Sequence, residues 1–321
     1  DYLAEGRHGN LDYLANEPAN RVDPTRRNPW ARSLLVFGQR YTQGWPADDP
    51  DPSAGGPTGT PDDPWIGRVA RYARGLDYHD VFLKDIKAVV AGLAERWPDL
   101  IAFPATDTGP YLEREWAWLA GLGFLGKNTC LIHEKLGSGL FLGVAPTNLD
   151  VEGLPAGQPQ AEPLYAVAPR RRLEPTRILA SHCGSCTACL DACPTDALLP
   201  GGGMDAGRCL STWTIEWRGN PPNNKAHEQG GLLFGCDSCQ AVCPWNRRAS
   251  EADTGAVRPE YGTLESHGEL KLADLLDLSD DVYRERFRRT PLWRAHPDGL
   301  VRNVRTVLEN LAPGPDQGKV P

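Results

Sequence analysis

The chain has 321 residues, 40% of them apolar, which is enough to bury a core and to form two or three units. It contains no run of about twenty apolar residues, and residues 1–10 lack the basic and apolar segments of a secretory signal. We therefore expect a cytoplasmic protein with no membrane attachment. The formal net charge of −8 argues against a generally basic nucleic-acid binder, although it says little about local faces.

Strand-like and helical patterns alternate along residues 1–177, which predicts an α/β domain. Residues 129–133 and 140–144 are joined by a glycine-rich turn, and we expect them to pair as a hairpin. Residues 44–64 and 151–175 are rich in proline and predict a surface loop and a linker. The other predicted elements are a strand at 33–37, helices within 65–97 that break near Gly75, a strand at 100–103 and a helix at 111–122.

Asp107 is the most informative carboxylate of this part of the chain. It follows the short apolar strand at 100–103, so its side chain is expected at a strand end, where binding residues often lie. Because Pro110 follows and begins a helix, Asp107 also fits a helix N-cap, and the local sequence alone favours that role. Residues 74–79 combine arginine, aromatic and histidine side chains in one turn, which would suit a polar substrate or a helix cap.

A glycine motif in the same region has the spacing of a dinucleotide site. Gly121, Gly123 and Gly126 spell G-x-G-x-x-G, but the motif follows a predicted helix and opens a strand. A dinucleotide fold needs the reverse order, so that the pyrophosphate meets a helix N-terminus. We therefore expect these glycines to allow close backbone approach to a ligand or to a neighbouring element.

Cysteines dominate residues 178–250. The first run has the C-x2-C-x2-C-x3-C-P spacing of bacterial ferredoxins, in which the fourth thiolate binds the other cluster. Eight thiols are available, enough for two 4Fe-4S clusters. The crossing rule predicts that one cluster is held by Cys183, Cys186, Cys189 and Cys243, and the other by Cys193, Cys209, Cys236 and Cys239.

Two other uses of these thiols are less consistent with the spacing. Structural zinc usually takes two C-x2-4-C pairs separated by a longer span, not three thiols at consecutive three-residue steps. A disulfide framework is typical of short secreted chains, and nothing at the start of this chain resembles a secretory signal. The spacing therefore favours iron–sulfur clusters.

Residues 251–321 are predicted to be helical, with short helices at 270–276, 280–289 and 299–311. This part is locally basic in an acidic chain, which suits either phosphate contacts or a solvated helix face. Its seven clustered arginines are Arg284, Arg286, Arg288, Arg289, Arg294, Arg302 and Arg305.

Several runs of residues resemble those of epoxyqueuosine reductases, in order, from Gly9 to about Ala312. These runs are RYARGLDYH (71–79), DTGPYLER (107–114), GLGFLGKN (121–128), FLG (141–143), CLSTWTIE (209–216), GCDSCQ (235–240) and CPWN (243–246). That family reduces an epoxide in a modified tRNA base to an alkene, the last step of queuosine synthesis. It uses base-off cobalamin and two 4Fe-4S clusters.

The resemblance implies three parts. Residues 1–177 would form an α/β cobalamin-binding domain similar to that of reductive dehalogenases, residues 178–250 a ferredoxin-like two-cluster domain, and residues 251–321 a helical region. Asp107 falls at the position of the family's proton donor, a role that needs a carboxyl pKa raised by a dry pocket. An external electron donor of the flavodoxin or ferredoxin type and a monomeric state are also expected.

The resemblance further implies contacts to the cofactor and to tRNA. Expected cobalamin contacts are Asp107, Lys127, Asn128, Leu131, Leu142, Thr212, Cys236 and Asp237. Expected tRNA phosphate contacts are Lys225, Arg247, Arg248 and the arginines after Asp280. Compared with the family, we expect a missing leading strand before Gly9, a longer insertion at 152–177 and no helical-repeat tail after Ala312.

Two other functions are compatible with cluster-binding cysteines. One is a cobalamin and iron–sulfur reductase of a small organic substrate, related to reductive dehalogenases, and the other is a ferredoxin-type electron carrier. The 182 residues that precede Cys183 are more than an electron carrier needs, so the sequence favours an enzyme with a substrate pocket.

Overall fold

The computed structural model describes residues 2–43, 45, 58–60, 63–150, 182–219, 226–251, 256–268 and 270–311. Most of the predicted loop at 44–64, all of the predicted linker at 151–175 and Lys225 lie outside the described residues. In the described part of the chain, no helix is long and apolar enough to cross a membrane.

The described strands pair two by two, as β1 with β7, β2 with β3, β4 with β8, and β5 with β6. Their bounds are β1 (Ser33–Arg40), β2 (Thr58–Thr60), β3 (Asp63–Ile66), β4 (Arg68–Val69), β5 (Phe124–Leu125), β6 (Leu131–Ile132), β7 (Leu140–Thr147) and β8 (Leu232–Phe234). The longest pair, β1 and β7, is antiparallel and runs from Ser33 opposite Thr147 to Arg40 opposite Leu140. Ala102 and Ala105 form bridges to β7, so the predicted strand at 100–103 lies beside it.

The helices are short except α2 and α11. Their bounds are α1 (Pro18–Val22), α2 (Tyr78–Arg96), α3 (Glu113–Leu119), α5 (Ala188–Asp191), α6 (Ser238–Ala241), α7 (Pro244–Glu251), α8 (Glu265–Gly268), α9 (Leu272–Leu276), α10 (Asp280–Phe287) and α11 (His296–Leu311). Short 3-10 turns occupy Asp12–Leu14, Pro24–Arg26, Arg71–Ala73, Ala206–Arg208, Ala226–Gln229, Pro259–Tyr261 and Pro291–Ala295, and Thr212–Glu216 is a π-helical turn. The predicted strand at 33–37, the helix at 111–122 and the three C-terminal helices are confirmed.

The predicted hairpin between 129–133 and 140–144 is wrong. Its first strand, β6, pairs with β5, and its second, β7, pairs with β1. The close pairing of β5 with β6 explains the glycine motif, because a Cβ at Gly123 would collide with the carbonyl of Ile132. Of the two alternatives that the sequence left open, a ligand and a neighbouring element, Gly123 fits the second.

Helix α2 packs on the β1–β7 pair. Its first turn is capped by Asp77, whose side chain accepts a hydrogen bond from the backbone N–H of His79. Phe82 and Ile86 are its buried residues, and a Cβ at Gly143 of β7 would meet the Ile86 side chain. This packing fixes the start of α2 close to the end of the strand that precedes Asp107.

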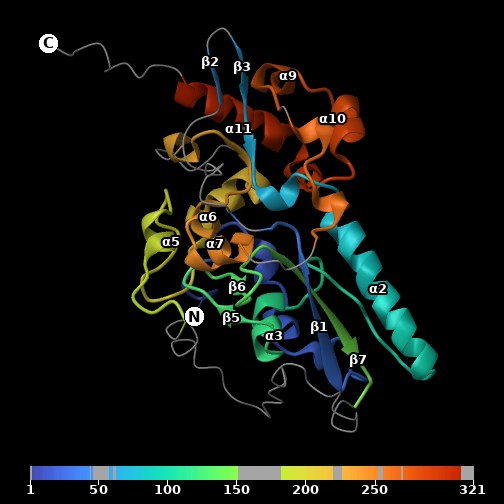
Figure 1. Cartoon of the computed structure of the whole chain (residues 1–321). Coiled ribbons are helices and arrows are strands. Elements are labelled where there is room, and N and C mark those ends of the chain that lie inside the picture. The colour runs from blue at the N-terminus through green and yellow to red at the C-terminus, as the bar shows by residue number, and fades with distance from the viewer. Residues whose placement is uncertain are drawn as a thin grey trace, which may run out of the picture.

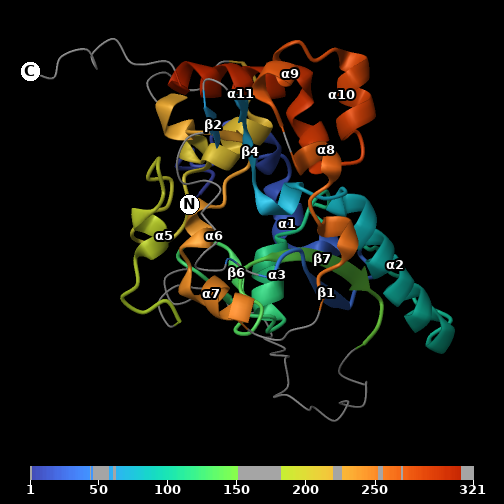
Figure 2. The ribbon, with the colours of Figure 1, turned by 45° about the horizontal axis from the view of Figure 1, so that its top comes forward.

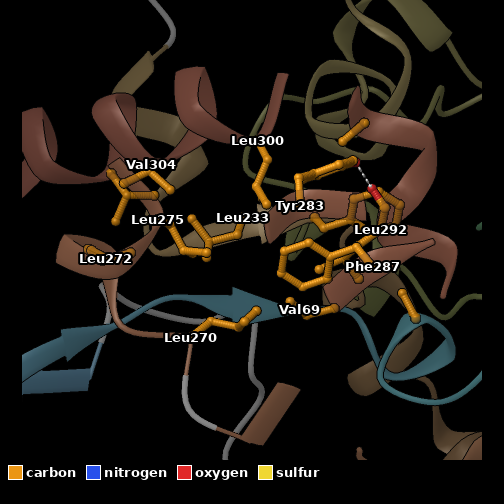
Figure 3. Packing of buried hydrophobic residues seen from close by; sticks show 14 residues of the cluster. Val69, Leu233, Leu270, Leu272, Leu275, Tyr283, Phe287, Leu292, Leu300 and Val304 are labelled. Atoms are coloured by element: carbon orange, nitrogen blue, oxygen red, sulfur yellow. Dashed lines mark hydrogen bonds between the residues drawn. The ribbon is translucent and has the colours of Figure 1, made fainter. Parts of the chain in front are cut away.

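The largest apolar core joins segments that are distant in the sequence (Figure 3). Val69 of β4 and Leu233 of β8 pack against the helices α9 to α11, which contribute Leu275, Phe287 and Leu300. Tyr283 belongs to the same core, and its hydroxyl donates a hydrogen bond of 2.6 Å to the carbonyl of Leu292. The C-terminal helices therefore complete a core that strands β4 and β8 begin.

The two larger groups of elements lie at opposite ends of the molecule (Figure 1). Helices α9 to α11 lie at one end with β2 and β3, and the β1–β7 pair and α3 lie at the other. Helices α5, α6 and α7 lie at one side, and α2 lies at the opposite side in both views (Figure 2).

Candidate active site and cluster site

Asp107 and the start of α2 form a row of three polar side chains. His79 Nε2 lies 3.0 Å from Asp107 Oδ2, and His79 Nδ1 lies 2.6 Å from Asp77 Oδ1. Asp107 has a backbone φ of 53°, a left-handed conformation that is unusual for a residue other than glycine. Such strain is often found at functional sites, and here it accompanies a carboxylate that is half exposed, at 51% of its side-chain surface.

The proton of this row is held by the imidazole. Burial would lower the pKa of His79, but the hydrogen bonds and charges of Asp107 and Asp77 outweigh it and raise the pKa to about 9. Burial would raise the pKa of Asp107, but the same His79 contact lowers it below the ordinary value, with help from the Arg294 charge. The expected raised carboxyl pKa is therefore wrong for this structure, in which an imidazolium faces a carboxylate.

Aromatic side chains cover the row on one side. The Tyr78 ring stacks on His79, with centroids 4.1 Å apart, and on Phe141 of β7, with centroids 4.2 Å apart. The Tyr78 hydroxyl also hydrogen-bonds to Asp107. Tyr72 lies edge-on to Tyr78, at 6.2 Å between centroids, and 6.3 Å from Phe234 of β8. An aromatic wall thus runs from β8, next to Cys236, to β7, next to Leu142.

A second carboxyl group lies beside Asp107. Burial raises the pKa of Glu113 to about 7, and the Asp107 charge adds to this shift, although a hydrogen bond to the Asp107 backbone opposes it. Glu113 Oε1 is buried without a hydrogen-bond partner among the described residues. A carboxyl in this position exchanges its proton near neutral pH.

Charged groups from distant parts of the chain also face Asp107. Arg294 forms an ion pair of 2.5 Å with Glu216, and its charge acts on both Asp107 and Tyr13. Asp77 N donates a hydrogen bond of 2.8 Å to the carbonyl of Arg289, so the C-terminal region also touches the start of α2. The site is therefore assembled from all three parts of the chain.

The first four predicted cluster ligands surround one cavity. Cys183, Cys186, Cys189 and Cys243 line a cavity of about 280 Å³, and its other lining residues are Lys127, Asn128, Ile132, His182, Ala188, Pro244, Trp245 and Arg248. The described cysteines form no disulfide. Among the described residues no group of three or more His, Cys, Asp or Glu side chains converges on a single ion. The four thiols instead stand around a space larger than one ion.

The other four thiols form a second group. Burial raises the pKa of Cys209, and repulsion from the neighbouring Cys193 adds to it. Burial also raises the pKa of Cys236 and of Cys239, and Cys209 contributes to both shifts. Cys236 packs against an apolar cluster that includes Leu210, the neighbour of Cys209. Asp237, which follows Cys236, is buried, and its Oδ2 accepts a hydrogen bond of 2.7 Å from Arg71 N.

The two residues that follow the G-x-G-x-x-G run contact the cysteine loops. Lys127 Nζ donates hydrogen bonds of 2.8 Å to the carbonyl oxygens of Gly184 and Cys186. The buried Asn128 donates one of 3.4 Å to the carbonyl of Cys239. These predicted cofactor contacts thus lie at the cysteine loops, and Leu131 is buried in β6 beside the cavity-lining Ile132.

Three of the remaining predicted cofactor contacts, Leu142, Cys236 and Asp237, lie within three residues of the wall residues Phe141 and Phe234 in the chain, and the fourth is Thr212. The carbonyl of Leu142 accepts a hydrogen bond of 2.7 Å from Thr106, the neighbour of Asp107. Thr212 is buried in the π-helical turn, while Cys236 and Asp237 follow β8. The structure therefore separates the predicted set into a group near Asp107 and the second thiols, and a group at the first thiols.

The arginines predicted to contact phosphate differ in exposure. Arg302 is half-buried and donates hydrogen bonds to the carbonyls of Trp213, Trp217 and Gly219. Arg286 is bound to the carbonyl of Ser266, and Arg294 to Glu216. The arginines that remain exposed are Arg247, Arg248, Arg284, Arg288, Arg289 and Arg305.

Sequence reasoning missed three residues of the site. It did not identify His79 as the partner of Asp107, and it did not assign Glu113 or Arg294 to the site. The turn at 74–79 gave a signal for His79, because an Asp two residues before a His at a helix start can bind both its backbone and its ring. Arg294 was identified only as one of seven clustered arginines, since its approach to Asp107 depends on the tertiary fold.

The thiols around one cavity and the cysteine spacing are those of an iron–sulfur oxidoreductase. A model of the 4Fe-4S double cluster binding domain matches residues 182–246, and one described as Epoxyqueuosine reductase QueG, DUF1730, matches residues 21–108. A curated epoxyqueuosine reductase from Synechocystis sp. is 34% identical over 315 residues, which cover 96% of this chain and 93% of that protein. The chain belongs to the epoxyqueuosine reductase family.

Solved structures agree with this assignment. The structure of epoxyqueuosine reductase from Streptococcus thermophilus is similar at a TM-score of 0.72 and 26% identity, covering 97% of this chain and 72% of that one. An epoxyqueuosine reductase solved with an epoxyqueuosine-modified stem loop of tRNA-Tyr has a TM-score of 0.72 and 26% identity, covering 92% and 69%. The fold of this chain is therefore that of the family.

Proposed function

We propose that this chain reduces epoxyqueuosine in tRNA to queuosine, with electrons relayed by two 4Fe-4S clusters. The observation that carries the proposal is the Asp77–His79–Asp107 row in a chain that also holds eight thiols in two groups. Converting an epoxide to an alkene takes up two electrons and two protons and releases the oxygen as water. The chain must therefore supply protons where it supplies electrons.

Asp107 is the residue that contacts the epoxide oxygen in this proposal, and His79 is its proton source. As a C–O bond breaks, negative charge develops on oxygen, and a proton delivered along the His79–Asp107 hydrogen bond neutralises it. The pair holds one exchangeable proton below a pH of about 9, the pKa of His79. Glu113, beside Asp107, is placed to supply the second proton.

The eight thiols would hold the clusters in the two groups described above. Cys183, Cys186, Cys189 and Cys243 share one cavity, and this supports the pairing inferred from the crossing rule. When bound, the clusters supply single electrons. Lys127 and Asn128 orient the two cysteine loops by hydrogen bonds to their carbonyls.

We further propose cobalamin as the cofactor beside Asp107, in an α/β domain similar to that of reductive dehalogenases. Phe234 and Phe141 are buried in the apolar cores, whereas Tyr72 and Tyr78 are partly exposed and could meet a flat, largely apolar macrocycle. Cobalamin supplies one-electron cobalt chemistry when bound. The residues that would hold it are Leu142, Thr212, Cys236 and Asp237.

The tRNA would approach over the exposed arginines of the C-terminal region, because Arg288 and Arg289 flank the start of α2. A small one-electron carrier of the flavodoxin or ferredoxin type would supply the electrons, and the chain would act as a monomer. A related reductase acting on a small organic substrate would not need these arginines.

The proposal is tested with protein reconstituted without oxygen. About eight irons and one cobalamin per chain are expected from the ligand count. Incubation with tRNA that carries epoxyqueuosine and a chemical reductant should yield queuosine, measured by mass spectrometry of the tRNA nucleosides. Full iron loading with unchanged epoxyqueuosine would refute the substrate, and zinc in place of iron would refute the reductase.

A further inference from the structure

The cavity of the first four thiols has an aromatic and cationic rim. The Phe124 ring stacks on His182, with centroids 4.3 Å apart, and meets Trp245 edge-on at 5.2 Å. The guanidinium of Arg248 lies over the Trp245 ring, 5.1 Å from its centroid. The His182 side chain is 41% exposed and Arg248 is exposed, so this rim faces solvent.

The charge of the rim differs in sign from that of the whole chain. The described residues that line the cavity include Lys127 and Arg248 but neither Asp nor Glu. Lys127 is committed to the carbonyls of Gly184 and Cys186, whereas Arg248 stands at the surface. One carboxylate, Glu134, lies nearby, 3.9 Å from His182. A local positive rim on a chain of net charge −8 attracts an acidic partner to this place in particular.

The second thiol group lies toward the substrate site. Asp237, the neighbour of Cys236, accepts a hydrogen bond of 2.7 Å from the backbone N–H of Arg71. The ring of Tyr72, the next residue, lies 6.2 Å from that of Tyr78, and Tyr78 precedes His79, the partner of Asp107. The residues that line the first cavity include none of Asp77, His79 and Asp107. An electron that enters at the first thiol group would therefore pass to the second thiol group before it reaches the substrate.

We propose that the surface formed by His182, Trp245 and Arg248 docks a small acidic electron-carrier protein, which passes electrons to the cluster held by Cys183, Cys186, Cys189 and Cys243. The proposal deepens the proposed function and rests on it. Each encounter oxidises the carrier by one electron and reduces the cluster by one. Two encounters provide the two electrons that one epoxide consumes together with two protons.

Transfer RNA is the other polyanion that Arg248 could meet. The rim favours the carrier, because His182, Trp245 and Arg248 line the same cavity as the cluster thiols, where an electron must enter. The exposed arginines that flank Asp77, by contrast, belong to the C-terminal region. Electrostatic docking of a carrier predicts a reduction rate that depends on salt.

The test uses the full chain loaded with both clusters, and Arg248→Glu with Lys87→Glu as the control. Lys87 is an exposed cation on α2, at the opposite side of the molecule from α7 (Figures 1 and 2). The first measurement is the rate of cluster reduction by reduced flavodoxin in a stopped-flow spectrometer, at low and at high salt. The same rate is measured with dithionite, and the Kd of oxidised flavodoxin is measured by calorimetry.

We expect Arg248→Glu to slow reduction by flavodoxin about tenfold at low salt and to weaken its binding by a similar factor. Dithionite should reduce this variant at the wild-type rate, and Lys87→Glu should match the wild type throughout. Equal flavodoxin rates and Kd values for the two variants would overturn the proposal. So would a variant that loses affinity for the tRNA stem loop but keeps flavodoxin binding. Since neither readout involves queuosine, failure of the proposed substrate would be recognised separately.

Discussion

The Nε2 atom of His79 lies 3.0 Å from Oδ2 of Asp107, while its Nδ1 atom lies 2.6 Å from Oδ1 of Asp77. One imidazole thus bridges two carboxylates, and it is the bridge, not Asp107, that retains a proton at neutral pH. This arrangement divides the work of an acid between two residues. In the proposed reaction, Asp107 contacts the substrate, and His79 stores the proton that Asp107 passes on.

Replacing His79 with Gln should keep a side chain of similar reach but remove the stored proton. The wild-type single-turnover rate should stay level up to a pH of about 9 and fall above it, because the pair loses its proton there. The variant should be slower by about 100-fold at neutral pH and gain rate toward acid pH. Rapid quenching of enzyme with pre-reduced clusters measures both profiles. A variant with the wild-type profile would remove His79 from the proton path.

Replacing Asp107 with Asn should preserve the shape of the site and abolish its proton delivery. We expect single turnover to fall by about 10²- to 10⁴-fold. Iron content should match the wild type, because Asp107 is not among the residues that line the cavity of the cluster thiols. A variant that loses iron would indicate a structural role for Asp107, and one with full turnover would remove Asp107 from the proton path. The predicted N-cap role does not apply, because α3 begins at Glu113 with Leu112 as its N-cap residue.

Replacing Glu113 with Gln should change how stability depends on pH. The pKa of Glu113 is raised by burial to about 7, so the folded chain holds this proton more tightly than the unfolded chain. The wild type should therefore lose stability as the pH rises from the ordinary pKa of a glutamate, 4.5, through about 7, the pKa of Glu113 in the folded chain. The variant should lose less stability over this range. The Tm as a function of pH measures this difference. Glu115→Gln, on the same helix α3, is the control and should follow the wild type.

Local sequence patterns identified the chemistry of the site but not its assembly. Cysteine spacing gave the two groups of four, because that spacing reflects how short loops wrap a cluster. The pairing of Asp107 with His79, 28 residues earlier, depends on α2 packing against β7, which no local pattern specifies. The same reason accounts for the approach of Arg294 to Asp107.

For the fold as well, local patterns predicted individual elements but not how the strands pair. The strand at 33–37 and the C-terminal helices follow from their periodicity. The hairpin failed because β7 pairs with β1, more than a hundred residues away along the chain, while β6 takes β5 as its partner. Short apolar segments indicate that a strand exists, but the partner of a strand is chosen by packing between distant segments.

The exposed arginines near the start of α2 should bind tRNA phosphates. The carbonyl of Arg289 accepts a hydrogen bond from Asp77 N, which places Arg289 beside the start of α2. The side chains of Arg288 and Arg289 are exposed. The double variant Arg288→Gln and Arg289→Gln should lose about tenfold or more in affinity for the stem loop near physiological salt. The slope of log K against log salt should also become shallower, by up to about two. Fluorescence anisotropy at several salt concentrations measures both.

Two control variants distinguish the loss of phosphate contacts from a general loss of stability. Lys87→Gln removes an exposed cation of α2 and should leave both the affinity and the salt slope unchanged. Arg302→Gln removes a half-buried guanidinium that donates to the carbonyls of Trp213 and Trp217, so it should lower the Tm while its salt slope stays that of the wild type. If the double variant keeps the wild-type salt slope, the phosphates must be met elsewhere on the chain. Because counterion release depends on the number of phosphate contacts, the slope distinguishes these cases even if the affinities are similar.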